Sequence, residues 1–226
     1  MGDAEETRRG SEGVAVKVIT CDQRSPEWFA ARLGRLTASS LGDAFATTKS
    51  GYSTSRRNLK LRLVLERLTG KSQENGYTNA AMERGVLIEP DARAAYEVES
   101  GLLVDTVGFI VHDELLTGAS PDGIIGDDGG LEIKCPGAAA HLDFLKSEVI
   151  PNDYQLQVAH TLWLTGRAWW DFVSFNPDFP EPLRLKVQRL RATDVNMAAH
   201  ELAVRLFLSE VDKELADVQA LMGVTV

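Results

Sequence analysis

Apolar residues along the chain follow a helical period in some stretches and a strand period in others. They recur every three to four positions within 56–68 and 80–100, which predicts amphipathic helices, with Pro90 kinking or dividing the second one. They alternate with charged residues over 183–187, which predicts a strand with one polar face. By the same criteria, further helices are predicted at 28–33, 137–147, 152–164 and 193–222 (capped by Thr193), with another opening near Ser39. Further strands are predicted at 14–19, 102–111 and 168–175, and residues 115–119 lead into a hairpin.

The order of these elements predicts the fold class. Helices come first, then a central mixed β-sheet of about five strands, then a final helix, so the sheet is flanked by helices in an α/β (α+β) layered domain. Residues 1–13 are polar and predict a flexible tail, and residues 14–226 predict a single domain. Residues 47–55 are rich in Ser, Thr, Gly and Lys and predict a flexible loop.

One hairpin carries an unusual set of charges. Residues 120–136 contain two apolar runs separated by the turn residues Asp127-Asp128-Gly129-Gly130. Side chains alternate along a strand, so Glu132 and Lys134 share one face, and the hairpin brings Asp122 toward Glu132. Two carboxylates and an ammonium among apolar residues are costly unless something pairs with them.

A divalent metal ion is the natural partner for this set. Carboxylate oxygens are hard ligands that suit Mg2+, and Lys134 is placed to orient or deprotonate a water molecule. The pattern resembles the PD-(D/E)xK nuclease superfamily, including the Pro before Asp122. From this pattern alone, an exposed hairpin with ordinary surface charges is an equally good interpretation.

The net charge of the chain limits where such a protein can contact nucleic acid. The 226 residues carry 24 Lys and Arg against 33 Asp and Glu, a net charge of −9, so contact with DNA must be local, through a basic patch or channel. Cys21 and Cys135 are too few for a disulfide framework or an iron–sulfur cluster. No apolar run is long enough for a membrane span and no signal-peptide core is present, so a cytoplasmic location is expected.

Four sequence blocks occur in an order that extends the resemblance. They are 32–39 (RLGRLTAS), 83–90 (ERGVLIEP), the 120–136 hairpin, and 154–157 (YQLQ). Together they resemble the YqaJ-type viral recombinase family, to which bacteriophage lambda exonuclease belongs, over residues from about Trp28 to Phe175. Each block is weak alone, but four in order make chance agreement improbable.

The resemblance implies a PD-(D/E)xK restriction-endonuclease-like core and a Mg2+-dependent exonuclease with two ions per site, with Mn2+ as a substitute. Such an enzyme degrades one strand of linear double-stranded DNA, 5′→3′, from a 5′-phosphorylated end. It leaves a 3′ single-stranded overhang for phage-type homologous recombination, which implies the cytoplasm of a bacterial host. Family members form ring-shaped homotrimers and work beside a single-strand annealing protein.

The resemblance also implies roles for individual residues. Asp122, Glu132 and Glu89 are expected to hold metal, with the Ile133 carbonyl as a further ligand, and Lys134 to hold the attacking water. The 5′-phosphate and adjoining DNA are expected at a set of polar residues, with two looser matches for tracking along the duplex. The polar set is Arg32, Ser39, Gln157, Tyr154 and Ser120, and the tracking residues are Lys49 and Met82.

Other interpretations stay open at this point. An endonuclease on the same fold and a non-catalytic DNA-end-binding protein are the alternatives to an exonuclease. Taken singly, Glu89 and Arg32 have an ordinary surface interpretation, and Met82 an ordinary core one. Ala159 stands where the family often has a second glutamine, so any contact made by that amide is missing.

Overall fold

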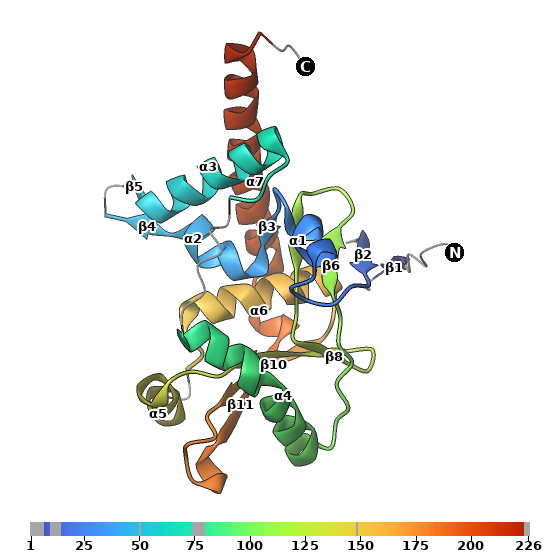
Figure 1. The fold of residues 1–226 in the computed structure, drawn as a ribbon, viewed down its shortest axis with the longest axis vertical. Helices are drawn as coiled ribbons and strands as arrows, with labels where there is room; N and C mark the ends of the chain where they lie inside the picture. Colours follow the sequence, from blue (N-terminus) through green and yellow to red (C-terminus); the bar gives the residue numbers. More distant parts are fainter. Residues whose placement is uncertain (1–6, 10–14, 50, 74–79, 148, 224–226) are drawn as a thin grey trace.

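The computed structural model describes residues 7–9, 15–49, 51–73, 80–147 and 149–223, and within them it shows a mixed α/β fold (Figure 1). The predicted class is confirmed, but the strands form two main sheets rather than one. The first has the order β1-β2-β6-β7-β3 and the second β11-β10-β9-β8. The first contains Thr7–Arg9 (β1), Ala15–Ile19 (β2), Phe109–His112 (β6), Thr117–Ala119 (β7) and Leu36–Thr37 (β3); the second contains Leu185–Arg191 (β11), Trp169–Phe175 (β10), Gly129–Lys134 (β9) and Gly123–Ile125 (β8).

The chain crosses from one sheet to the other next to Asp122. Strand β7 ends at Ala119 and β8 begins at Gly123, so residues 120–122 join the two sheets. Strands β9 and β10 pair in parallel, with Glu132 opposite Phe172 and Lys134 opposite Ser174. The division into two sheets therefore places the charged hairpin at their junction.

Helix α6 (Asn152–Thr165) lies at the centre of the molecule, and its residues from Val158 to Leu164 are all buried (Figure 1). Helix α4 (Ala80–Ser100) packs on the second sheet and continues as one helix across Pro90. The remaining helices are Pro26–Arg32 (α1), Leu41–Phe45 (α2), Thr54–Thr69 (α3), Ala138–Ser147 (α5) and Met197–Leu221 (α7), with short 3-10 turns at Ala38–Ser40 (η1), Glu181–Leu183 (η2) and Ala192–Asp194 (η3). No helix in the described part of the chain is long and apolar enough to span a bilayer.

Several local predictions differ from the structure. Ser39 lies inside η1 instead of capping a helix, and Asn196, rather than Thr193, caps α7 by accepting from the Ala199 N–H. The predicted 47–55 loop contains a small hairpin, β4 (Thr47–Thr48) and β5 (Gly51–Tyr52). Residues 7–9 of the predicted tail pair with β2, and 102–108 precede β6 instead of belonging to it. Pairing with β2 and the Asn196 side-chain cap decide two of these boundaries, and composition reveals neither.

The basic residues of α3 mostly face α7. Arg56 pairs with Glu210 at 2.8 Å, and Lys60 pairs with Glu214 at 2.7 Å. Arg67 likewise pairs with Asp212 of α7 at 2.6 Å. The acidic side chains of α7 therefore offset the charge of these three basic residues within the chain.

The two glycines at the start of β9 serve packing rather than the turn. A Cβ atom on Gly129 would lie 2.1 Å from the Trp169 ring, and one on Gly130 would lie 2.2 Å from the Trp170 ring. The turn itself uses Gly126, whose φ of +49° favours glycine. The glycines thus allow two tryptophans to press against the strand that carries Glu132 and Lys134.

Two histidines form a buried chain of hydrogen bonds beneath β7. The Thr117 hydroxyl donates to the Leu36 carbonyl at 2.6 Å, so it accepts from His160 Nε2 at 2.9 Å. His160 Nδ1 must then accept from His200 Nε2 at 3.0 Å. Burial lowers the pKa of His160 well below its usual value and that of His200 to about 4. Both rings are therefore neutral in the folded protein.

Acidification should destabilise the protein through these histidines. Because their pKa values are lowered on folding, the unfolded chain binds more protons below its ordinary histidine pKa, and stability falls as pH drops. For His200 alone the loss between pH 8 and pH 5 is roughly 2 kcal/mol. Urea unfolding without divalent metal, at a series of pH values, measures the free energy of unfolding of the wild type and of His200→Gln. The glutamine keeps an N–H donor but does not titrate, so the stability of this variant should depend less steeply on pH. An equally steep pH dependence in the two proteins would contradict the prediction.

Candidate active site

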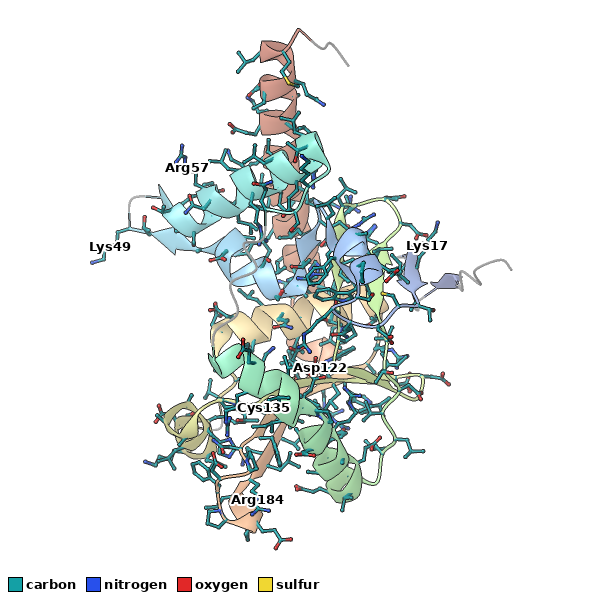
Figure 2. All side chains as sticks on the ribbon, in the orientation of Figure 1. Lys17, Lys49, Arg57, Asp122, Cys135 and Arg184 are labelled. Atoms are coloured by element: carbon teal, nitrogen blue, oxygen red, sulfur yellow. The ribbon has the colours of Figure 1, made fainter. Side chains whose placement is uncertain are left out.

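Asp122 is tied directly to the strand that carries the other two candidate catalytic residues. Its Oδ2 accepts a 2.6 Å hydrogen bond from the Ile133 N–H. Ile133 lies in β9 between Glu132 and Lys134, so this single bond fixes Asp122 beside both of them. Figure 2 places Asp122 near the centre of the molecule. The predicted approach of Asp122 to the second strand of the hairpin is confirmed.

Glu132 and Lys134 lie on the same face of β9, as their spacing predicts. Lys134 Nζ donates to Glu132 Oε1 at 2.6 Å, and Gln157 Nε2 donates to the same oxygen at 2.6 Å. The Tyr154 ring centroid is 5.1 Å from Lys134 Nζ, within cation–π range. Helix α6 therefore contributes two residues of the YQLQ block to the charged hairpin.

Glu89 joins this group from α4. Arg93 donates to Glu89 Oε1 at 3.0 Å, and the Arg24 guanidinium lies 4.0 Å from Oε2. The Glu89 carboxylate also interacts electrostatically with Asp122 and with Glu132. The three acidic residues predicted to act together thus lie in one region, brought from a helix, a connecting segment and a strand.

Burial and mutual repulsion make these carboxylates hard to ionise. Burial raises the pKa of Glu132 to about 7, with Asp122 and Glu89 adding to the effect while Lys134 opposes it. Burial also raises the pKa of Asp122, and burial followed by the charge of Asp122 raises the pKa of Glu89. An additional cation at this site would offset that cost.

Lys134 responds to its neighbours in the opposite sense. Burial by itself lowers the pKa of its ammonium, but Glu132 and Asp122 outweigh this and raise the pKa above the ordinary lysine value. Lys134 therefore stays protonated at neutral pH. Of the two roles predicted for it, a protonated lysine suits orienting a water or a phosphate oxygen, not removing a proton.

The donor chemistry of the site fits a hard divalent cation. Asp122, Glu132 and Glu89 supply carboxylate oxygens, the type of ligand that Mg2+ prefers. Within the described ranges, no three Asp, Glu, His or Cys side chains are close enough in their present rotamers to enclose an ion. Glu132 Oε1 instead accepts from Lys134 and Gln157, so metal binding requires these carboxylates to reorient.

The residues predicted to bind the 5′-phosphate fall into separate groups. The Arg32 guanidinium stacks 4.1 Å from the Trp28 ring centroid, and Trp28 Nε1 donates to Ser120 Oγ at 2.7 Å. Ser39 is exposed on η1, with its hydroxyl 3.3 Å from Thr37 Oγ1. Arg32 and Ser120 are thus linked through Trp28, while Gln157 contacts Glu132. A shared phosphate pocket of Arg32, Ser39 and Gln157 stays a prediction.

The remaining predicted contacts lie elsewhere. Lys49 is exposed at the β4–β5 hairpin and, like Arg57, projects away from the body of the molecule (Figure 2). The Met82 side chain lies outside the described residues, although its backbone belongs to α4. Ala159 is buried in α6, 7% exposed, so the missing family amide leaves no surface gap.

Sequence reasoning gave no role to Arg84, which the structure connects to the catalytic strand. Arg84 donates to the carbonyls of Cys135 and Pro136, both at 3.3 Å, and Asn176 Nδ2 donates to the Pro136 carbonyl at 3.0 Å. The Arg84 bonds anchor the chain just after Lys134 to α4, and the Asn176 bond ties it to the segment that follows β10. Arg84 stands in the ERGVLIEP block, but nothing in that pattern identifies its partners.

An aspartate before a hairpin, a Glu-x-Lys strand and a helical glutamate on a mixed α/β scaffold define a PD-(D/E)xK restriction-endonuclease-like fold. The chain belongs, more narrowly, to the family described as the YqaJ-like viral recombinase domain, whose model matches residues 27–168. Family and fold together support a nuclease role, and specifically an exonuclease role, for this chain.

Solved structures agree with this assignment. An alkaline exonuclease (LHK-Exo) from Laribacter hongkongensis is 38% identical with a TM-score of 0.80, covering 88% of this chain and 98% of its own. Its complex with dAMP matches with a TM-score of 0.81 at the same identity and coverage. A phage related exonuclease from Haemophilus somnus 129PT, 13% identical with a TM-score of 0.61, covers 81% of this chain and 96% of its own and shares the fold. A search of curated proteins finds no significant match.

Proposed function

We propose that this chain is a Mg2+-dependent 5′→3′ exonuclease. It degrades one strand of linear double-stranded DNA from a 5′-phosphorylated end and leaves a 3′ single-stranded overhang. The observation that carries the proposal is the convergence of Asp122, Glu132, Lys134 and Glu89 at the junction of the two sheets. The 38% identical relative of known structure is described as an alkaline exonuclease, which supports the proposal.

Asp122, Glu132, Glu89 and the Ile133 carbonyl are the residues proposed to hold the metal, two ions per site, with Mn2+ as a substitute. Bound metal would supply a water of lowered pKa and charge stabilisation for the phosphodiester oxygens. Lys134, protonated beside Glu132, orients the nucleophilic water and offsets negative charge on the phosphate. In the structure Gln157 and Lys134 both donate to Glu132 Oε1, so these two bonds change when the carboxylate turns toward a metal ion.

The direct test is digestion of matched linear and circular duplexes with Mg2+. We expect loss of the linear duplex and an intact circle, with mononucleotides released and one strand surviving. Labelling each strand at its 5′ or 3′ end gives the direction. Cleavage of the circle would instead indicate an endonuclease, and binding to ends without cleavage a non-catalytic protein.

Arg32 is proposed to hold the terminal 5′-phosphate, with Ser39 and Gln157 as polar contacts and Tyr154 and Ser120 nearby. A terminal phosphate carries more negative charge than an internal diester, and a guanidinium pairs with it in two hydrogen bonds. Arg32→Ala should therefore reduce cleavage of 5′-phosphorylated duplex about 10- to 100-fold and remove most of its advantage over 5′-hydroxyl duplex. Initial rates on both substrates measure this; an unchanged preference would remove Arg32 from the site. Arg35→Ala is the control on the same segment.

We further propose a ring-shaped homotrimer and a role in phage-type recombination beside a single-strand annealing protein, with Lys49 and Met82 tracking along the duplex. In a ring, the acidic chain needs only a local basic lining around the DNA. Light scattering should give a mass three times the 24.7 kDa of the chain. A monomer at micromolar concentration that still digests DNA processively would contradict the trimer.

A further inference from the structure

The turn before α1 contains an unusual backbone conformation. Arg24 has φ of +71°, and among the residues that the structure describes it is the one non-glycine residue with positive φ. This left-handed region disfavours a side chain with a Cβ atom, and such strain persists where the surroundings impose it, often at functional sites. A glycine would adopt this conformation without cost.

The surroundings of Arg24 do impose it. On one side Gln23 Nε2 donates to the carbonyls of Val107 at 3.0 Å and Pro121 at 2.8 Å. On the other, the Ser25 N–H donates to the Asp22 carbonyl at 3.1 Å, closing the turn, and Ser25 caps α1. Because Pro121 directly precedes Asp122, the Gln23 bonds attach this turn to the active-site segment.

This arrangement directs the Arg24 side chain toward Glu89. The Arg24 guanidinium lies 4.0 Å from Glu89 Oε2 and is 54% exposed, while Arg93 lies 3.0 Å from Oε1 and is 23% exposed. Burial raises the pKa of Glu89 and of Asp122, and the charge of Arg24 opposes part of that rise. Glu89 is therefore already paired closely by Arg93. The contact with Arg24 is long and solvent-exposed, which makes it weak and easily exchanged for another anion.

We propose that Arg24 binds a backbone phosphate of the DNA strand at the active site, and that Glu89 is its partner while DNA is absent. The proposal rests on the nuclease function above. A strand entering a site with three carboxylates meets repulsion, and a guanidinium at the rim offsets it while fixing the phosphate through two parallel hydrogen bonds. Glu89 is then released from one of its two arginines as the phosphate takes the guanidinium.

Three substitutions separate charge from backbone strain. Arg24→Gln removes the charge and keeps a Cβ atom in the left-handed conformation. Arg24→Gly removes the charge and relieves the strain, and Arg24→Lys keeps a charge but loses the planar fork. Lys213→Gln, an exposed change of the same charge on α7, is the matched control. The full-length chain is used throughout.

Binding is measured by fluorescence anisotropy with a 5′-phosphorylated duplex in EDTA, over a range of NaCl concentrations. Arg24→Gln and Arg24→Gly should each bind about tenfold more weakly than wild type. The slope of the logarithm of the binding constant against the logarithm of the NaCl concentration should be smaller in magnitude by about 1. Arg24→Lys should lie between them and wild type, and Lys213→Gln should match wild type. With Mg2+, kcat/KM should fall about tenfold for the uncharged variants, mainly through KM. The Tm of Arg24→Gly should not fall below that of wild type.

Binding by Arg24→Gln and Arg24→Gly within twofold of wild type, with an unchanged salt slope, would overturn the assignment. So would a Tm of Arg24→Gly several degrees below wild type, because Arg24 would then stabilise the turn rather than contact DNA. A wild-type protein that neither binds nor cleaves DNA ends would instead overturn the proposed nuclease function. The two failures are therefore distinguishable.

Discussion

Replacement of Asp122 by asparagine should reduce DNA cleavage at least about a thousandfold, because an amide is a poor metal ligand and the site loses a charge needed to hold the cation. The fold should survive. The substituted amide keeps an oxygen that accepts from the Ile133 N–H, the bond that is 2.6 Å long in the wild type. Initial rates with Mg2+ on 5′-phosphorylated linear duplex measure the loss.

The same variant should be at least as stable as wild type without metal. Burial raises the pKa of Asp122, so ionising this carboxyl costs the folded state more than the unfolded state, and a neutral amide avoids that cost. Mg2+ should raise the Tm of wild type but not of Asp122→Asn, since only the wild type binds the ion in its folded state. Asp127→Asn, an exposed change in the same hairpin, is the control and should keep both activity and the Mg2+ response. Wild-type cleavage by Asp122→Asn would show that the hairpin is not the active site.

Substitution of Lys134 by alanine should lower kcat by about 10²- to 10⁴-fold, the range for loss of a group that acts on the water or the leaving oxygen. KM should change little, because the carboxylates remain. The exposed Lys146→Ala on α5 removes the same charge away from the site and should leave kcat unchanged. A Lys134→Ala enzyme that retains about a third of the wild-type kcat would exclude this role.

The pH profile gives Lys134 a second, independent test. Without metal the pKa of Glu132 is about 7 while Lys134 lowers it, so in the wild type the affinity for Mg2+ should rise with pH through this region as Glu132 ionises. Without the ammonium the pKa of Glu132 is higher still, and the rise in Mg2+ affinity should move to higher pH. Superimposable profiles for the two enzymes would mean that Lys134 does not act on Glu132.

Local sequence was sufficient for most elements near the site. The alternation over 129–134 placed Glu132 and Lys134 on one face, because side-chain direction in a strand has a period of two. Ser25-Pro26-Glu27 has the residue preferences of a helix start, and the Ser25 hydroxyl accepts from the Trp28 N–H as the cap of α1. The i, i+3 spacing of Tyr154 and Gln157 placed both on one face of α6, and both lie at the Glu132–Lys134 pair.

The pattern of apolar and polar residues does not show which distant segments of the chain contact each other. Alternation identifies a strand but not its neighbours, so the division into two sheets at residues 120–122 was missed. The basic residues of α3 have the acidic partners Glu210, Asp212 and Glu214, which lie about 150 positions further along the chain, so local sequence does not reveal these pairs. Gly129 and Gly130 looked like turn residues because the tryptophans that need their missing side chains come from β10.

For this protein, the sequence by itself determined the class of chemistry, because carboxylates and a lysine at fixed spacing on one strand keep their relation in any fold that contains the strand. The tertiary structure decided which other residues join them. Glu89 and Arg24 come from segments far apart in the chain, and only packing of α4 and the 22–25 turn against the hairpin brings them within 4.0 Å of each other. The structure also decided that Lys134 stays protonated, since its pKa depends on burial and on the positions of Glu132 and Asp122, which no linear spacing specifies.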